Sequence, residues 1–131
     1  MLVRNISRAC KPLENFKDKT KIILTNKRHE YSMMIIRGLG MEKYFAEIVG
    51  IDSTPYVKPD PLIIQYLLDR YRADKEKTVI AGDGINDIIV AKNSGILSCA
   101  LLNGLGNRND LLNLKADYYC EDILEMNSLF C

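Results

Sequence analysis

Short apolar runs alternate with amphipathic segments along most of the chain. The apolar runs, which are rich in Ile, Val and Leu, predict buried strands. They cover residues 21–25, 47–50, 78–81, 97–101 and 117–119. The amphipathic segments predict helices. They cover residues 29–39, a stretch after two prolines up to about residue 72, the stretch that contains Ile88, Ile89 and Ala91, and residues 110–114.

Glycine and proline mark the ends of the predicted helices. Gly38 and Gly40 stop the helix that begins near residue 29, because glycine readily takes the left-handed conformation that ends a helix. Pro59 and Pro61 break the chain and suit the first turn of the following helix. We expect the apolar face of that helix to include Leu62, Ile63, Tyr66 and Leu67.

Strands separated by helices require crossover connections, which are right-handed and place helices against a mostly parallel sheet. The pattern therefore predicts a three-layer, Rossmann-like α/β core, built as one domain over residues 1–131. In such sheets ligands bind at the carboxyl ends of the strands, where several loops meet. We therefore look for chemistry in the residues that directly follow each predicted strand.

Composition narrows the possible partners. The chain has 131 residues, 47% of them hydrophobic, which is enough for one folded core. Its formal net charge of +1 gives no electrostatic reason to expect nucleic acid or an acidic membrane surface as a partner. No apolar run is long enough to span a membrane, and residues 1–10 are interpreted as a leader or the remnant of another segment.

The four cysteines do not form a CxxC pair, and His29 is the only histidine, so a structural zinc site is not expected. Free thiols suit a reducing compartment, and we expect the protein to be cytoplasmic. Gly104-Leu105-Gly106 resembles the start of a nucleotide fingerprint. The third glycine and the acidic partner of that motif are missing, so we do not expect a dinucleotide site.

Thr25, Asn26 and Lys27 follow the first predicted strand and begin the next helix. A hydroxyl, an amide and the amino end of a helix can together bind a phosphoryl group. An ordinary helix cap would use the same residues, so both interpretations stay open. Lys58 precedes Pro59, and its ammonium group could neutralise a phosphoryl group or could simply be solvated.

Gly82-Asp83-Gly84-Ile85-Asn86-Asp87 follows the strand at residues 78–81. Carboxylates four residues apart at a strand-to-helix turn can face the same point, and such hard oxygen ligands suit Mg²⁺. An ordinary helix start, with Asp83 or Asn86 as the cap, is the alternative. The sequence therefore predicts Asp83 and Asp87 as metal ligands at this turn.

In this order and at these intervals, the segments T-N-K, K-P-D-P and G-D-G-I-N-D resemble motifs II, III and IV of the haloacid dehalogenase superfamily. The resemblance is closest to phosphoglycolate phosphatase and its relatives, and it extends from about Lys11 to the end of the chain. It implies a Mg²⁺-dependent phosphomonoester hydrolase with a small phosphorylated substrate. By this resemblance Thr25, Asn26 and Lys58 bind the phosphoryl group, Lys58 also acts in catalysis, and Asp83 and Asp87 bind Mg²⁺.

The nucleophile of that family comes from an amino-terminal D-x-D-G-T motif, and no D-x-D occurs in this sequence. The resemblance therefore implies a core that lacks its first strand and its cap. Several hypotheses follow: a fragment of a full phosphatase, one half of a split phosphatase, or a non-catalytic protein that binds Mg²⁺ and phosphate. A partner chain or a homo-oligomer could compensate for the missing strand.

Overall fold

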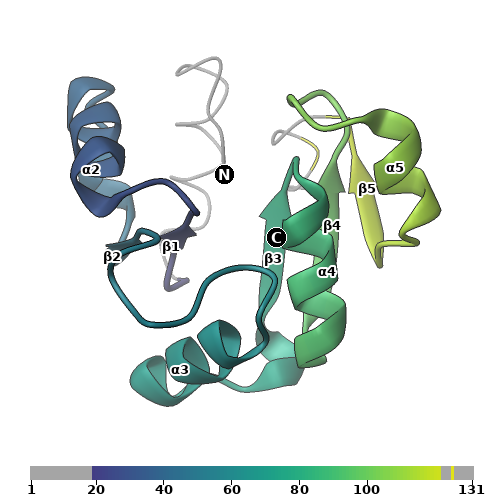
Figure 1. Ribbon diagram of the computed structural model, residues 1–131, viewed down its shortest axis with the longest axis horizontal. Helices are drawn as coiled ribbons and strands as arrows, with labels where there is room; N and C mark the ends of the chain where they lie inside the picture. Colours follow the sequence, from purple (N-terminus) through teal and green to yellow (C-terminus); the bar gives the residue numbers. More distant parts are fainter. Residues whose placement is uncertain (1–18, 122–124, 126–131) are drawn as a thin grey trace. The chain divides into compact units, whose positions relative to one another are not determined.

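The computed structural model describes residues 19–121 and 125 of the chain (Figure 1). The predicted leader at residues 1–10 lies outside this part. The described residues form two compact units, one that runs to Pro55 and one that begins at Tyr56. We call them the first and the second unit, and each is described by itself.

The first unit is a small parallel α/β structure. In chain order it contains β1 (Ile22–Leu24), α2 (His29–Gly38), the 3₁₀ helix η1 (Glu42–Tyr44) and β2 (Glu47–Val49). β1 and β2 pair in parallel with Ile23 opposite Ile48. These two residues form a buried core with Ile36 of α2 and with Met41. The apolar residues of both strands are therefore covered by the helix that connects them.

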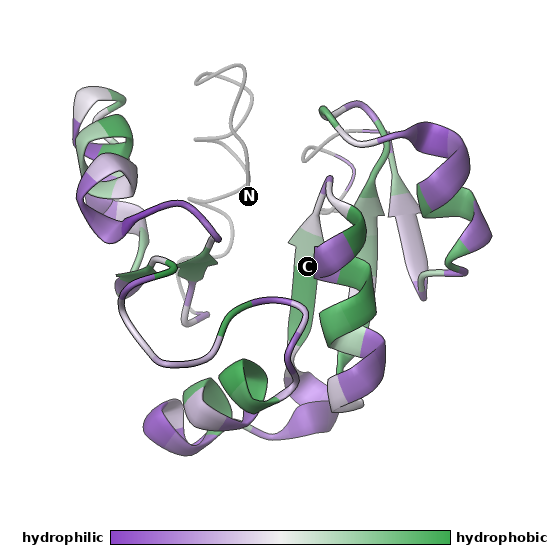
Figure 2. Cartoon of the chain, in the orientation of Figure 1, coloured by the Kyte–Doolittle hydropathy of each residue, from purple (hydrophilic) through white to green (hydrophobic). Residues whose placement is uncertain are grey.

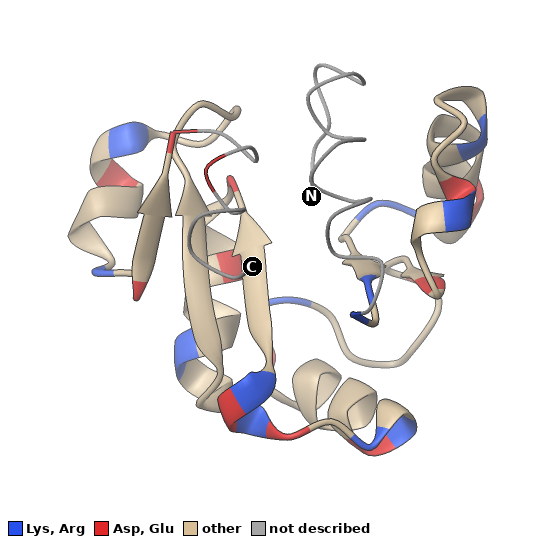
Figure 3. Ribbon diagram, turned by 180° about the vertical axis from the view of Figure 1, so that it is seen from behind, with Lys and Arg blue, Asp and Glu red and all other residues tan. Residues whose placement is uncertain are grey.

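The second unit is a three-stranded parallel sheet in the order β3-β4-β5. Its elements are α3 (Leu62–Tyr71), the 3₁₀ helix η2 (Lys75–Lys77), β3 (Val79–Gly82), α4 (Ile85–Ser94), β4 (Leu97–Leu101), α5 (Arg108–Asn113) and β5 (Tyr118–Cys120). Figures 1 and 3, which view the chain from opposite sides, show α4 and α5 on the same face of this sheet. The expected α/β architecture with parallel strands is confirmed.

Apolar packing holds α4 and α5 to the sheet. Ile88 of α4, Ala100 of β4 and Leu111 of α5 are fully buried against one another. Figure 2 shows hydrophobic residues along β3, β4 and the middle of α4. Because α4 begins directly after β3, this packing also fixes the strand-to-helix turn at residues 82–85.

The helix ends follow the expected chemistry. α2 ends at Gly38, and Gly40 has a φ of +68°, the left-handed conformation that glycine adopts without strain. Gly95 ends α4 in the same way with a φ of +74°. The predicted stop at Gly38 and Gly40 is confirmed.

The predicted apolar face of α3 is partly wrong. Ile63 is buried as expected, but Ile64 and Leu68 are also buried, whereas Leu62 is 51% exposed. Leu62 is the first residue of the helix, and its peptide N–H donates to the carboxylate of Asp60. The helix is therefore rotated by about one residue step relative to the prediction.

No helix in the described ranges is long and apolar enough to cross a membrane.

Replacing Ile88 with Ala should test the core of the second unit. We expect a loss of about 2–5 kcal/mol in the free energy of unfolding, because a fully buried side chain is removed. Ile85, on the same helix, is 44% exposed, and Ile85→Ala should change stability by no more than about 0.5 kcal/mol. Denaturation in urea measures both. Equal losses in the two variants would contradict the assigned orientation of α4.

Candidate functional site

Thr25 lies directly after β1, where the chain turns toward α2. Its peptide N–H donates to the carbonyl of Val49 at 3.0 Å, which extends the pairing of β1 with β2. Its hydroxyl oxygen accepts the peptide N–H of Lys27 at 3.1 Å. Within the described ranges this hydroxyl donates to no acceptor, so its hydrogen is available to an incoming oxygen. Asn26 follows on the exposed side of the same turn.

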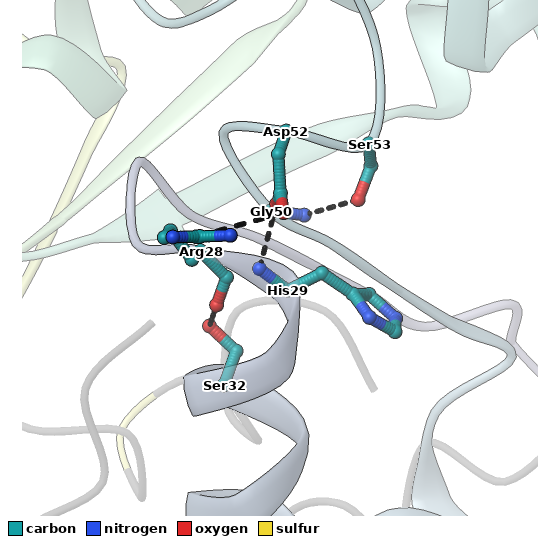
Figure 4. Close-up of polar contacts among 6 residues, drawn as sticks. All are labelled: Arg28, His29, Ser32, Gly50, Asp52 and Ser53. Carbon is teal, nitrogen blue, oxygen red and sulfur yellow. Dashed lines mark hydrogen bonds and ion pairs between the residues drawn. The ribbon is translucent and has the colours of Figure 1, made fainter.

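The loop after β2 holds the amino end of α2 (Figure 4). The carboxylate of Asp52 accepts the peptide N–H of His29, the first residue of α2, at 2.8 Å. A Cβ on Gly50 would lie 2.4 Å from the nitrogen of His29, so only glycine allows this approach. The helix start therefore has a side-chain cap that comes from the loop and not from its own N-cap residue, Arg28. His29 itself lies exposed at the amino end of the helix.

The same contact affects the ionisation of Asp52. The hydrogen bond from the His29 peptide N–H lowers the pKa of the Asp52 carboxyl, and the nearby Arg28 guanidinium adds to the effect. The Nε of Arg28 is 3.9 Å from this carboxylate. The negative charge that a helix amino end favours is thus already supplied in part by a side chain of the protein.

In the second unit, Lys58 and Asp87 form a buried ion pair. The Lys58 Nζ is 2.5 Å from Asp87 Oδ1, and each side chain is 9% exposed. Asp87 Oδ2 accepts the peptide N–H of Gly84 at 3.2 Å. Asp87 lies in the first turn of α4, where the helix dipole also favours a negative charge. Both oxygens of this buried carboxylate therefore have donors.

Asp83 stands at the end of β3 in a different setting. Its Oδ2 accepts the peptide N–H of Leu105 at 2.9 Å. Across the part of the chain that the structure describes, its Oδ1 accepts no hydrogen bond. The side chain is half-buried. One oxygen of Asp83 is therefore held by the backbone, and the other is open to a ligand.

Glycines surround both carboxylates. A Cβ on Gly82 would lie 2.0 Å from Asp87 Oδ2, and one on Gly104 would lie 2.2 Å from the Cβ of Asp83. A Cβ on Gly106 would lie 1.8 Å from the Asp83 carbonyl oxygen. The sequence showed Gly104 and Gly106 as a G-x-G pair after a strand, but it did not relate them to Asp83. Because neither position has a side chain, the loop that contains Gly104 and Gly106 can lie directly against Asp83.

The predicted site residues divide between the two units. Thr25 and Asn26 belong to the first unit, and Lys58, Asp83 and Asp87 belong to the second. Within the second unit, the side chains of Lys58 and Asp87 form an ion pair, so these two predicted site residues lie next to each other. No group of three or more His, Cys, Asp or Glu side chains that could hold a metal occurs within the described ranges. A cation here would have Asp83 Oδ1 as its open protein ligand and would keep several waters, as Mg²⁺ commonly does.

The role of Asp52 can be tested by pH. Because its pKa is lowered on folding, its contribution to stability is present above the unfolded pKa, about 3.9, and is lost as the pH falls through the lower folded pKa. We expect Asp52→Ala to speed hydrogen exchange of the α2 amides at neutral pH, with the difference from the unchanged protein shrinking below about pH 4. A difference that stays constant down to pH 2 would contradict this role.

Comparison with known proteins gives the family. The model of the haloacid dehalogenase-like hydrolases matches residues 3–101. Phosphoglycolate phosphatase of Vibrio cholerae is 31% identical over 101 residues, which are 77% of this chain and 45% of that protein. The same enzyme of Neisseria gonorrhoeae is 36% identical over 86 residues, which are 66% of this chain and 36% of that protein. The chain thus spans about half or less of the length of these relatives.

Solved structures of similar fold support the same family. A crystal structure of a predicted phosphoglycolate phosphatase from Haemophilus somnus has a TM-score of 0.88 and 25% identity, covering 95% of this chain and 56% of that one. A haloacid dehalogenase-like hydrolase from Streptococcus pneumoniae has a TM-score of 0.84 and 26% identity, covering 95% of this chain and 59% of that one. From its matching family model, its relatives and its fold, the chain belongs to the haloacid dehalogenase-like hydrolase family.

Proposed function

We propose that this chain carries the Mg²⁺-binding and phosphate-binding side of a phosphomonoester phosphatase site of the phosphoglycolate phosphatase type. The observation that carries the proposal is the buried Lys58–Asp87 ion pair, whose aspartate lies in the first turn of α4, directly after the turn that carries Asp83 and follows β3. Buried charges are costly unless they are paired, and such arrangements concentrate at functional sites. The substrate is a small phosphorylated molecule.

Lys58 would stabilise the charge of the transferring phosphoryl group. Its ion pair with Asp87 holds the ammonium in one place, so less side-chain entropy is lost when the substrate binds. Asp87 thus acts on the substrate through Lys58, in addition to the metal role that the sequence suggested for it.

Asp83 would be the main protein ligand of Mg²⁺, through its open Oδ1. When bound, the metal would neutralise negative charge on the phosphoryl oxygens. Both oxygens of Asp87 already accept one hydrogen bond each, so a bond from Asp87 to the cation would use the remaining lone pairs. Asp87 is accordingly the second ligand in this proposal and Asp83 the first.

Thr25 and Asn26 would contact the phosphoryl oxygens from the turn after β1. The bond from the Lys27 N–H to the Thr25 oxygen orients the hydroxyl so that its hydrogen points away from that N–H. A hydroxyl in this state is a good donor to a phosphoryl oxygen. Because Asp52 already caps α2, we assign the phosphate contact to the Thr25 and Asn26 side chains more than to the helix dipole.

The attacking group of the proposed reaction is an aspartate. Its carboxylate oxygen forms a bond to phosphorus while the bond to the leaving alcohol oxygen breaks, and water then hydrolyses the aspartyl phosphate. No D-x-D occurs among the 131 residues, and we propose that this aspartate is supplied from outside them, either by the remainder of a longer phosphatase chain or by a partner chain, as in a split phosphatase. The same observation favours a second candidate function, a non-catalytic protein that binds Mg²⁺ and phosphate.

We place this activity in the cytoplasm. The support is chemical: Cys99 and Cys120 are buried with their sulfurs 3.5 Å apart and are not joined in a disulfide, a state that suits a reducing compartment. A partner chain or a homo-oligomer is part of the proposal as compensation for the missing strand; because a second copy of this chain would again have no D-x-D, it is not the source of the attacking aspartate.

Hydrolysis of p-nitrophenyl phosphate with Mg²⁺ separates the two candidates. For the complex isolated from its native source we expect turnover that falls at least about a hundredfold in Asp83→Asn, because the charge stabilisation supplied through the metal is lost. Asp69→Asn is the matched control, since Asp69 is exposed on α3 and its carboxylate accepts a hydrogen bond from the side-chain amide of Gln65. Isolation of a lone chain without turnover would count against the split phosphatase and favour the non-catalytic candidate.

Breaking the ion pair should cost stability in a characteristic way. Lys58→Met leaves the Asp87 charge buried without its partner, and we expect a loss of about 3–5 kcal/mol in the free energy of unfolding. Adding Asp87→Asn removes that charge, and the double variant should be more stable than Lys58→Met alone. Urea denaturation of the single and double variants measures the coupling. Strictly additive losses would show that the pair is not formed in solution.

A further inference from the structure

The loop between β4 and α5, residues 102–107, packs its backbone directly onto Asp83. We propose that this loop is a positioning element for the metal ligand: the peptide N–H of Leu105 binds Asp83 Oδ2 and leaves Oδ1 as the oxygen that takes the divalent cation. The inference rests on the proposed function, because it assumes that Asp83 binds a cation. The positioning group is a backbone N–H, so no side-chain motif in the sequence specifies it.

The loop is tied down at both ends. The N–H groups of Leu102 and Asn103 donate to the carbonyls of Cys120 and Glu121 at 2.8 and 3.0 Å. Arg108, the first residue of α5, makes a two-point contact with the carboxylate of Glu121 at 2.8 and 3.0 Å. A loop held at both ends against β5 can keep the Leu105 N–H at a fixed place relative to Asp83.

Gly104 and Gly106 make the close approach possible. A Cβ on Gly104 would lie 2.2 Å from the Asp83 Cβ and 2.4 Å from Oδ2. A Cβ on Gly106 would lie 1.8 Å from the Asp83 carbonyl oxygen. Neither glycine has a positive φ, so alanine could adopt their backbone conformation. The requirement for glycine here is one of space, and any side chain would push the loop away from the carboxylate.

The side chain of Leu105 takes no part in this contact. It is 73% exposed, and only the peptide N–H of the residue bonds Asp83. A hydrogen bond to one carboxylate oxygen fixes the plane of the group and lowers its freedom to rotate. Groups that orient a metal ligand in this way typically change metal affinity by about 10–100-fold. A loop with only a structural role would leave metal affinity unchanged in a folded variant.

The test measures Mn²⁺ binding to the full chain by electron paramagnetic resonance, with Mn²⁺ standing in for Mg²⁺. Leu105→Pro removes the N–H, and we expect its affinity to fall at least about tenfold. Leu105→Ala keeps the N–H and should bind as the unchanged chain does. Gly104→Ala should also weaken binding, whereas Gly38→Ala, whose Cβ would meet no atom within 4 Å, should not.

The outcomes separate this inference from the proposed function. If the unchanged chain binds no Mn²⁺, the metal-binding function fails and the inference falls with it. If it binds and both Leu105→Pro and Gly104→Ala bind equally well, the inference is overturned while the proposed function stands.

Hydrogen exchange provides a readout that does not depend on the proline variant folding. In Asp83→Ala the acceptor is lost, and exchange of the Leu105 amide should become faster. The His29 amide, which is bonded to Asp52, serves as the internal control and should keep its rate. Equal exchange of the Leu105 amide in both proteins would overturn the inference.

Discussion

The buried carboxylate of Asp87 is the constraint on which the second unit depends. Its residue is 6% exposed, and a charge so enclosed is tolerated only when donors surround it. Lys58 and the peptide N–H of Gly84 supply those donors, and Gly82 leaves the space that the carboxylate fills. The end of β3, the start of α4 and the segment before α3 are thereby fixed around one negative charge.

The first unit solves a related problem with different atoms. The first peptide N–H of α2 needs an acceptor, and the loop after β2 brings one in the form of Asp52. Here too a glycine, Gly50, permits the approach of two backbone segments. In both units, then, a strand-to-helix turn is held by a carboxylate and a glycine.

Much of this could be predicted from the sequence, because local patterns determine it. The strands, the helices and the turns that carry Thr25, Lys58 and Asp83 follow from hydrophobic periodicity and from glycine and proline. The capping of His29 by Asp52 and the bond from Leu105 to Asp83 could not, since the partners are 23 and 22 residues apart. The buried face of α3 was missed for the same reason: Ile64 and Leu68 are buried by tertiary packing, which periodicity alone does not orient.

The close approach of the main chain to Asp83 and Asp87 has a consequence for protein design. Copying Asp83 and Asp87 onto another strand-to-helix turn would reproduce the carboxylates but not their surroundings, because one neighbour is a bare backbone N–H and others are positions where a methyl group does not fit. The transferable unit is therefore a pair of closely approaching main-chain segments. A scaffold chosen for such a graft should be selected by its backbone spacing before any side chain is placed.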